Sequence, residues 1–566
     1  MTEELSSNKT MEESKLSSSD KIVETDAGFT IVLELSQDEL FFDKKKNLLR
    51  NKGFDIREEI QLESSATPDS ISTTLEKLLE VARIKRLDEV ELYFDEANEY
   101  PSAKYFSSRN EVEALNSILY LVNNFLRGKT EKEGILQRLA DAIVDRIQVL
   151  ANKNRVETRI DTSCTCDKEK CLVEWGERNG VRTNLEIACV MGAGRGAIAT
   201  KDLEVGDIAL EIPVSLIISE EVVHGTNMYH ILENLDGVSS ETMLLLWSMK
   251  ERHNCSSKFK MYFDTLPKDF NTGLGFGVDA IVSLEGTLLL EEIMLAKEHL
   301  REQYDKLVLT LCSNNPDVFP PHLYTWEQFL WACELWYSNS MKILFADGKL
   351  RTCLIPIAGF LNHSLYPHIV NYGKVHSATN TLKFPLSRPC HVGEQCCLSY
   401  GNYSSSHFIT FYGFLPQGDN PYDVISLDVG EADRTEDCSI SGWSTHMVRG
   451  TWFSNNHTIF HYGFPSPLLD YLRRAQSPEL DRKTITQSNL QNEIEVLEIL
   501  QSIFSEMMQN HGTDTDMIDS ENDSWDVKLA TEYKDLQRRI ISSILASCDA
   551  GIELVQTELS KMNMLA

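Results

Sequence analysis

An Asn-His pair at the end of an apolar run is the first feature of the sequence that suggests chemistry. Asn362 and His363 directly follow the run LIPIAGFL, residues 354–361. That run reads as buried, and placing an amide and an imidazole beside it without hydrogen-bond partners costs free energy. Either the fold or a bound ligand must satisfy these polar groups, so the pair is a candidate binding site.

A glycine-rich stretch, MGAGRGAIA at residues 191–199, is a second candidate. Its glycines at 192, 194 and 196 leave a backbone that a ligand can approach closely. A dinucleotide-binding loop should follow a strand and open a helix. Here the glycines lead into β-like sequence, which argues against an oxidoreductase. A simple glycine turn between strands explains this stretch, taken alone, equally well.

A third stretch, LSYGNYSSSHFITFYGFLP at residues 398–416, contains Tyr400, Tyr403 and Tyr412. Tyrosines beside glycine in β-rich sequence are more often core or rim residues than catalysts. The order along the chain changes this expectation. A glycine-rich loop, a distant Asn-His pair, a Tyr-Gly step and a short helix ending in Tyr-Gly-Phe together make a compound pattern.

This compound pattern resembles the split SET-domain protein methyltransferases typified by the Rubisco large-subunit lysine methyltransferase. The resemblance covers roughly residues 171–566 and is most specific in the two SET halves. The matching segments are GRGAIATKDLEVGDIALEIPVSLIIS for the opening of the domain, FKMYFDTLP and LEGTLL for the helical insertion, LIPIAGFLNHS for the Asn-His motif, FYGF for the active-site tyrosine, and PSPLLDYLRRA with ATEYKDLQRRIISSIL for the C-terminal substrate-binding domain.

The resemblance implies S-adenosylmethionine as the cofactor and assigns a role to each candidate residue. Asn362 and His363 would hold the methionine and adenosine parts, and Tyr412, with Tyr400 beside it, would line the channel where the substrate nitrogen meets the methyl group. The remaining cofactor contacts would come from Ala193, Gly194, Arg195, Gly196 and Asn339. Methyl transfer from a sulfonium is an in-line displacement, so the protein mainly aligns the reacting atoms. An apolar, aromatic channel also favours the neutral amine, and no metal is required.

Asn339 is a departure from the family pattern. In WYSNSMKIL it stands where relatives have an arginine that contacts the cofactor, and it lacks the charge that would meet a carboxylate. Arg195 is a candidate substitute. Gly359 occupies a second position where relatives often have aspartate.

The motif CTCDKEKC raises the question of zinc. Cys164, Cys166 and Cys171 have the C-x-C-x4-C spacing of a post-SET zinc motif, but they precede the SET region and no fourth ligand is evident. We therefore expect reduced loop cysteines and no metal. No cysteine lies in a recognisable nucleophile signature. Three further histidines are expected to lie on the surface or to have hydrogen-bond partners within the protein: His376, His391 and His407.

Composition limits the class of protein. The 566 residues predict two to four domains, and the 42% apolar and 25% charged residues are typical of a soluble globular chain. The net charge of −32 argues against nucleic acid as a partner, and no segment reads as a membrane span. The acidic start lacks an apolar signal region, so we expect cytoplasmic or nuclear location, with plastid targeting less favoured, and reduced thiols.

Apolar periodicity predicts the order helix, β, helical insert, β, helix. The resemblance implies an α+β fold: a SET-domain β-sheet core with a knot-like crossing, a helical insertion, and mainly helical N- and C-terminal domains. The expected parts are a disordered N-terminus (1–25), a helical N-terminal region of unknown role (26–160), the first SET half (161–225), the helical insertion (226–345), the second SET half (346–440) and a helical substrate-binding domain (441–566). Within 197–219, breaks at Gly206-Asp207 and Pro213 predict a hairpin, and Gly393-Glu394 predicts a turn that feeds a strand.

The resemblance thus implies a protein-lysine N-methyltransferase that binds a non-histone protein through its C-terminal helices, and we expect a monomer. Two alternatives stay open. In the first, the methylated residue is a histidine instead of a lysine. In the second, the chain is a catalytically silent SET scaffold that binds a partner, and Asn339 is the main support for this alternative.

Overall fold

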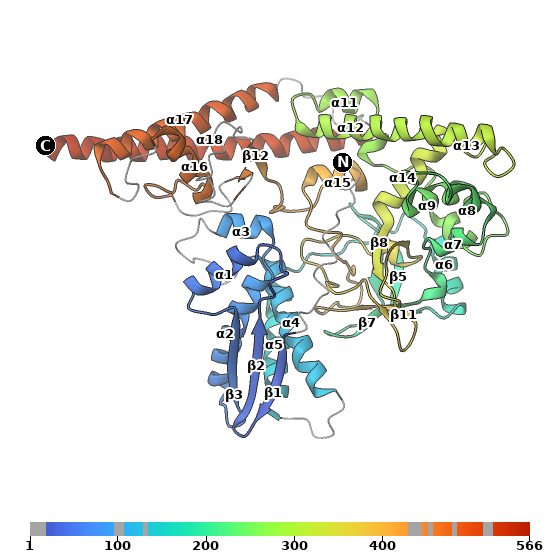
Figure 1. The fold of residues 1–566 in the computed structure, drawn as a ribbon, viewed down its shortest axis with the longest axis horizontal. Coiled ribbons are helices and arrows are strands. Elements are labelled where there is room, and N and C mark those ends of the chain that lie inside the picture. The colour runs from blue at the N-terminus through green and yellow to red at the C-terminus, as the bar shows by residue number, and fades with distance from the viewer. Residues whose placement is uncertain are drawn as a thin grey trace. The chain divides into compact units, whose positions relative to one another are not determined.

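The computed structural model describes residues 19–95, 107–127, 134–427, 443, 445–450, 457–477, 484–512 and 524–565. The chain divides into two compact units (Figure 1). The first unit comprises Met1–Leu87, Tyr105–Phe270 and Leu300–Asn402, and the second comprises Asp88–Lys104, Asn271–His299 and Tyr403–Ala566. Each unit is described by itself.

The N-terminal part of the first unit combines a sheet with helices. Its elements are β1 (Lys21–Thr25), β2 (Gly28–Glu34), α1 (Phe42–Asn51), β3 (Arg57–Glu63), α2 (Pro68–Lys85), α4 (Ser108–Leu126) and α5 (Gly134–Lys153). The three strands form an antiparallel sheet in the order β1-β2-β3 (Figure 1). Helices α2 and α4 pack against the sheet, and α5 packs against both helices.

Two predictions for this part are wrong. Residues 26–160 are not wholly helical, because β2 and β3 belong to the sheet, and residues 21–25 are a strand instead of a disordered tail. The first 18 residues lie outside the described part. In β3 the sequence REEIQLE alternates, with Ile60 and Leu62 buried. That period of two is the signal of a half-buried strand, and the helical prediction overlooked it.

The helices begin at the residues that local chemistry favours. The hydroxyl of Thr67 accepts the backbone N–H of Ser70 at the start of α2, and Pro68 occupies the first helical position. The hydroxyl of Ser107 likewise accepts the N–H of Asn110 at the start of α4. The predicted helical stripes in these segments and in α5 are confirmed.

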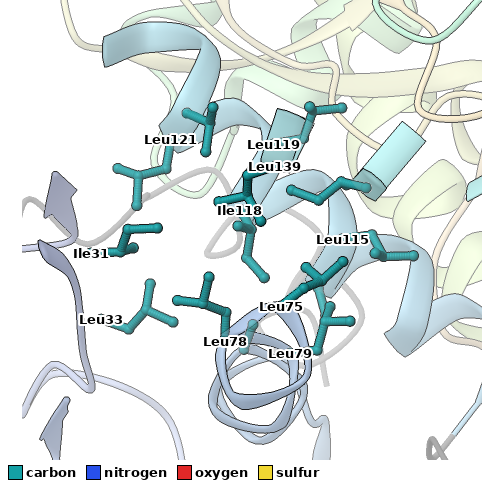
Figure 2. Packing of buried hydrophobic residues seen from close by; sticks show 14 of the residues in the cluster. Ile31, Leu33, Leu75, Leu78, Leu79, Leu115, Ile118, Leu119, Leu121 and Leu139 are labelled. Carbon is teal, nitrogen blue, oxygen red and sulfur yellow. The ribbon is translucent and has the colours of Figure 1, made fainter. Parts of the chain in front are cut away.

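The apolar core of this part extends to the segment that follows the Asn-His pair. Figure 2 shows side chains from β2, α2, α4 and α5 pointing toward one another. Tyr366, which follows the Asn-His pair, belongs to the same buried cluster. In addition, Nδ2 of Asn116 on α4 donates to the carbonyl of Ser387 at 2.9 Å. The N-terminal region therefore shares one core with the segment that carries the candidate site.

The rest of the first unit surrounds short sheets with helices. Its elements are α6 (Asp167–Arg178), β4 (Arg182–Thr183), β5 (Leu185–Val190), β6 (Gly194–Ala199), β7 (Ile208–Pro213), η2 (Val214–Leu216), α7 (Glu221–His224), α8 (Asn227–Leu232), α9 (Ser240–Glu251), α10 (Lys260–Thr265), η4 (Tyr304–Val308), α13 (Leu309–Asn314), α14 (Trp326–Asn339), β8 (Ser340–Leu344), β9 (Leu350–Leu354), η5 (Ala358–Phe360), β10 (Val375–His376) and β11 (Thr381–Pro385). The sheets have the orders β10-β11-β7-β4, β5-β6 and β8-β9.

The strands pair differently from the local prediction. The expected hairpin within 197–219 does not form, because β6 pairs with β5 while β7 lies between β11 and β4. After Gly393 the chain makes isolated bridges at Gln395 and Leu398 instead of a named strand. Partners distant in sequence decide both outcomes, and local turn signals do not encode them.

The second unit is mainly helical. Its elements are α3 (Glu89–Asp95), η3 (Gly273–Gly275), α11 (Val278–Ser283), the start of α12 (Leu288–Gln303), α15 (Ser405–Tyr412), β12 (Ile425–Leu427), β13 (His446–Val448), α16 (Ser466–Gln476), α17 (Gln487–Asn510) and α18 (Trp525–Leu565). Helices α17 and α18 lie side by side, and α11 packs against α18 (Figure 1). By length and composition alone α18 would also suffice to cross a membrane, a test that core helices pass too. Its Ile540, Ile541 and Ile544 are fully buried in the core with α17.

Truncation of Ile118 tests the shared core. Ile118 on α4 is fully buried, so Ile118→Ala should lower the free energy of unfolding by about 2–5 kcal/mol. Tyr120→Ala on the same helix is the matched control, because 46% of that side chain is exposed. Urea titration measures both variants. An Ile118→Ala variant as stable as the control would contradict the packing of α4.

Candidate functional site

The glycine-rich stretch is the turn of a β-hairpin. Strands β5 and β6 pair from Leu185↔Ala199 to Val190↔Gly194, and the turn occupies residues 191–193. Gly192 and Gly194 have φ angles of 76° and 67°, which glycine adopts without the strain of a side chain. A Cβ at Gly194 would meet nothing within 4 Å, so the backbone of the loop is open on that side.

The amide of Asn362 holds this loop in place. Its Nδ2 donates to the carbonyls of Ala193 (3.4 Å) and Arg195 (3.1 Å) and to Oε1 of Gln395 (3.2 Å). Its backbone carbonyl accepts the N–H of Leu398 at 2.9 Å. One residue therefore connects the glycine loop with the segment 395–398.

Gly196 makes this connection possible. A Cβ at this position would clash with Oε1 of Gln395 and would lie 3.2 Å from Nδ2 of Asn362. The absence of a side chain lets both polar groups reach the strand. The structure thus gives Gly196 a packing role, which differs from the cofactor contact that the resemblance implies.

His363 is a neutral imidazole in a buried setting. Its Nδ1 accepts the backbone N–H of Tyr400 at 3.1 Å, and burial lowers the pKa of the ring to about 4. A neutral ring that accepts at Nδ1 carries its proton on Nε2. The ring lies 5.4 Å from that of Tyr400, and burial raises the pKa of the Tyr400 phenol. Both side chains are therefore uncharged near neutral pH.

The backbone immediately before the Asn-His pair is strained. Ile357 has φ 73° and ψ −47°, although a β-branched residue strongly disfavours positive φ. Its side chain is buried and packs against Gly176 of α6, where a Cβ would clash with it. Packing therefore enforces the conformation, and such strained residues cluster at functional sites.

Arg195 is already engaged within the protein. Its Nη1 donates to Oε1 of Glu169 at 2.5 Å and to the carbonyl of Thr265, and its guanidinium lies 5.2 Å from the ring centre of Phe360. Sequence reasoning missed Glu169, whose position in the first turn of α6 gives no sign of a distant partner. The predicted substitution of Arg195 for the missing family arginine would have to compete with this ion pair.

Asn339 lies beside the same segment. It is the last residue of α14, its Nδ2 donates to Oγ of Ser338 at 2.7 Å, and its Oδ1 would lie 3.4 Å from a Cβ at Gly359. Gly359 is three residues from Asn362. The structure therefore brings Asn339 close to the Asn-His segment, and its role as a cofactor residue stays a prediction.

Tyr412 belongs to the second unit, where it ends α15. Gly413 caps the helix with φ 75°, and a Cβ there would clash with the carbonyl of Asn271. The ring of Tyr412 lies in an aromatic group, 5.7 Å from Phe408 and 6.2 Å from His407. His407 stacks on Tyr403 at 4.0 Å, and burial lowers the pKa of this imidazole to about 4.

A buried polar network centred on His368, which sequence reasoning missed, lies next to the Asn-His segment along the chain. His368 donates from Nε2 to Glu394 (3.3 Å) and accepts the N–H of Cys397 at Nδ1 (3.1 Å). Because Nδ1 accepts this N–H, the His368 ring is neutral in this geometry and carries its proton on Nε2. The side chain of Arg388 adds donors to the carbonyl of Tyr366. The network joins the segment that follows the Asn-His pair to the segment that Asn362 contacts.

The cysteines differ from the prediction. Cys164 is not a reduced thiol, because it forms a disulfide with Cys189 on β5. Cys166 is buried nearby, whereas Cys171 is exposed and outside the group. The spacing C-x-C-x4-C therefore does not correspond to a three-cysteine cluster among the described residues.

The three remaining histidines have ordinary settings. His376 is exposed on β10 and Nδ1 of His391 lies 3.5 Å from Asp202. His407 is the stacked ring described above.

No family model matches the chain. The chloroplastic fructose-bisphosphate aldolase-lysine N-methyltransferase of Arabidopsis thaliana is 26% identical over 271 residues, 46% of this chain and 55% of the relative. The chloroplastic Rubisco large-subunit N-methyltransferase of Pisum sativum is 25% identical over 314 residues, 53% of this chain and 62% of the relative. An actin-histidine N-methyltransferase of Gallus gallus is 24% identical over 274 residues, 46% and 45% of the two chains. The chain spans about half the length of the curated relatives it matches.

The structural likeness covers more of the chain. The SET domain of LSMT bound to lysine and AdoHcy matches with a TM-score of 0.52 at 20% identity, covering 70% of this chain and 92% of that chain. Rubisco LSMT bound to AdoMet matches with a TM-score of 0.51 at 19% identity, covering 71% and 97%. The chain has the SET-domain fold of Rubisco LSMT. The predicted mixed helix-and-sheet SET fold is confirmed, and the sequence resembles that methyltransferase family.

A side chain at position 196 should disturb this SET-fold loop. Gly196→Ala should displace the amide of Gln395 and weaken the Asn362 bonds, lowering the free energy of unfolding by about 1–3 kcal/mol. Gly225→Ala is the control, because a Cβ there meets nothing within 4 Å. Thermal unfolding of both variants beside wild type measures the effect. Equal stability of the two variants would contradict the close approach at Gly196.

The low pKa of His363 predicts a pH dependence. The unfolded ring takes up a proton below about pH 6.5 while the folded ring stays neutral down to about pH 4, so stability falls with pH in this window. His363→Asn cannot titrate, and its stability should fall by about 2 kcal/mol less than that of wild type between about pH 6.5 and about pH 5. Urea titrations at both pH values measure this, with exposed His376→Asn expected to behave as wild type. Equal decreases in wild type and His363→Asn would contradict the buried neutral ring.

Proposed function

We propose that the chain is an S-adenosylmethionine-dependent protein N-methyltransferase that acts on lysine. The observation that carries the proposal is the Asn362 amide, which fixes an open glycine loop against the 395–398 segment within a SET fold. Solved structures with this fold contain AdoMet or AdoHcy, and one of them also contains lysine. The two plant relatives are methyltransferases, one of them lysine-specific by name.

The residues around the loop fit such a cofactor. The open backbone at Gly194 lets a small molecule approach closely, and the neutral His363 and Asn339 offer polar groups without charge. When bound, S-adenosylmethionine supplies the methyl group on a sulfonium. In this proposal Asn362 acts mainly by positioning the loop, because its Nδ2 is committed to three protein oxygens.

The tyrosines fit the reaction because they stay protonated. The raised pKa of the Tyr400 phenol keeps it neutral, so it can hydrogen-bond and orient an amine without adding charge. Tyr412 sits in an aromatic group whose faces tolerate a methylated cation, and the neutral His407 in that group does not repel one. An aromatic environment also favours the neutral amine, the form that attacks.

Histidine is a second candidate target. It is supported by the similarity to actin-histidine N-methyltransferases. An imidazole is largely neutral near pH 7, so this reaction needs less help from desolvation than lysine methylation does.

A catalytically silent scaffold is the third candidate. Asn339 lacks the family charge and Arg195 is paired with Glu169, so no described arginine at the loop is free of an ion pair to replace it.

The substrate and its location are part of the proposal. By resemblance to the family, α16, α17 and α18 would bind a protein substrate. A monomer without nucleic-acid or membrane partners, in cytoplasm or nucleus, stays a prediction. The names of the two plant relatives point to the plastid as an alternative.

Methyl transfer by site variants tests the proposal. Asn362→Ala should raise the Kd for S-adenosylmethionine about 5- to 30-fold, because the loop loses bonds worth about 1–2 kcal/mol. Tyr412→Phe should lower tritium transfer into extract proteins about 100-fold with little change in Kd, because the phenol orients the amine. Mass spectrometry of the labelled band identifies the modified residue and separates lysine from histidine.

Two exposed residues provide matched controls. Asn234→Ala and Tyr120→Phe should bind and transfer as wild type, because both side chains lie on the surface, and Tyr120 is 46% exposed. Transfer by wild type and Tyr412→Phe at equal rates would contradict the role of Tyr412. Absence of cofactor binding by wild type, with binding gained in Asn339→Arg, would favour the silent scaffold.

A further inference from the structure

Three sulfur atoms from two distant segments meet beside the glycine loop. Cys164 and Cys166 precede α6, and Cys189 lies on β5. Cys164 and Cys189 form a disulfide, Sγ of Cys166 lies 3.5 Å from Sγ of Cys189, and all three sulfurs lie within 4.8 Å of one another. We propose that these cysteines form a thiol–disulfide exchange centre that reacts with dithiol reductants and controls the glycine loop.

The burial of the three cysteines assigns their roles. Cys164 is exposed, whereas Cys166 and Cys189 are 6% and 8% exposed. A reductant in solution therefore reaches Cys164, and Cys166 exchanges internally. Burial and the neighbouring Glu169 carboxylate raise the pKa of the Cys166 thiol, which keeps it protonated at rest.

Reduction of the Cys164–Cys189 disulfide by a dithiol takes place in two exchange reactions. A thiolate of the dithiol attacks Sγ of Cys164, the bond to Sγ of Cys189 breaks, and Cys189 leaves as a thiolate that takes a proton. The second thiol of the reductant then attacks its own sulfur in the mixed disulfide and releases Cys164 as a thiol. Two electrons and two protons pass to the protein, and the dithiol becomes a cyclic disulfide.

The internal step needs no external electrons. The Cys166 thiol loses its proton and attacks Sγ of Cys189, so a Cys166–Cys189 bond forms. The Cys164–Cys189 bond breaks, and Cys164 leaves as a thiolate and takes up a proton. The short distance between Cys166 and Cys189 makes this exchange possible without movement of the strand.

The state of the other cysteines favours exchange over a fixed structural bond. In the described part of the chain, ten cysteines besides Cys164 and Cys189 are free. Cys166 is one of them, and it and six others are buried within the first unit. A chain built for an oxidising compartment would pair most of its cysteines, whereas a single disulfide among thiols is typical of a reactive one. A structural disulfide also has no need of a third buried thiol in contact with it.

The centre is coupled to the candidate site through β5 and β6. Cys189 is the register partner of Arg195, and its carbonyl accepts the N–H of Asp161 at 2.8 Å. Glu169, three residues after Cys166, holds the Arg195 side chain. Opening the disulfide removes a covalent tie between the start of α6 and this hairpin. The resulting change in cofactor affinity rests on the proposed function.

Differential alkylation of the full chain tests the exchange itself. After equilibration with oxidised glutathione, wild type should contain the Cys164–Cys189 disulfide, and Cys164→Ser should form Cys166–Cys189 instead. Cys171→Ser is the matched control and should give the wild-type pattern, because Cys171 is exposed and outside the group. A freely alkylated Cys166 in oxidised Cys164→Ser would overturn the proposal. So would one equivalent of bound zinc that is lost in Cys166→Ser.

Cofactor titration tests the coupling separately. The Kd for S-adenosylmethionine should differ at least about fivefold between oxidised and dithiothreitol-reduced wild type, and Cys189→Ser should show no such difference. Equal Kd values in both wild-type states would overturn control of the loop while leaving the proposed function standing. No binding in either state, with the expected disulfides present, would overturn the proposed function and leave the exchange supported.

Discussion

The side-chain amide of Asn362 is the interaction on which the rest of the site depends. A single Nδ2 group contacts the carbonyls of Ala193 and Arg195 and the amide oxygen of Gln395, and the loop and Gln395 are separated by about a third of the chain. The backbone N–H of Cys396 donates to the carbonyl of Ala197 at 2.8 Å, so backbone bonds also join the 395–398 segment to β6. The turn at residues 191–193 lies beyond these bonds, and its backbone is open at Gly194. The amide supplies the directional contacts that make one site out of them.

Three features of the fold constrain the segment that carries this amide. The strained Ile357 orients the chain just before the pair, and its buried side chain against α6 maintains that conformation. Behind the pair, His368 and Glu394 satisfy each other in the interior, where an unpaired charge would be costly. Tyr366 joins the segment to the N-terminal core. The N-terminal region, which has no recognised counterpart in the family, thereby becomes part of the support of the site.

The electrostatics of the site are unusual for so acidic a chain. The net charge is −32, yet His363 and Tyr400 are both neutral, and Arg195 is neutralised by Glu169. Burial accounts for the neutral imidazole and phenol, since it disfavours their charged forms. A site of this kind suits a cationic cofactor and a neutral nucleophile better than it suits an anionic ligand. The cysteine group adds a covalent tie at Cys189, close to the turn of the same hairpin.

The sequence by itself determined the residue types of the candidate site and several helices of the two units. The apolar stripes of α2, α4 and α5 and the short helix ending at Tyr412 depend on local periodicity and caps, so their prediction succeeded. Tertiary structure alone decided the pairing of β2 with β3, the pairing of β7 with β11, the disulfide from Cys164 to Cys189 and the ion pair of Arg195 with Glu169. Each of these joins residues that are distant along the chain or compete with several possible partners. A periodicity of two or four residues cannot specify such partners, because their choice depends on which surfaces the whole fold brings together.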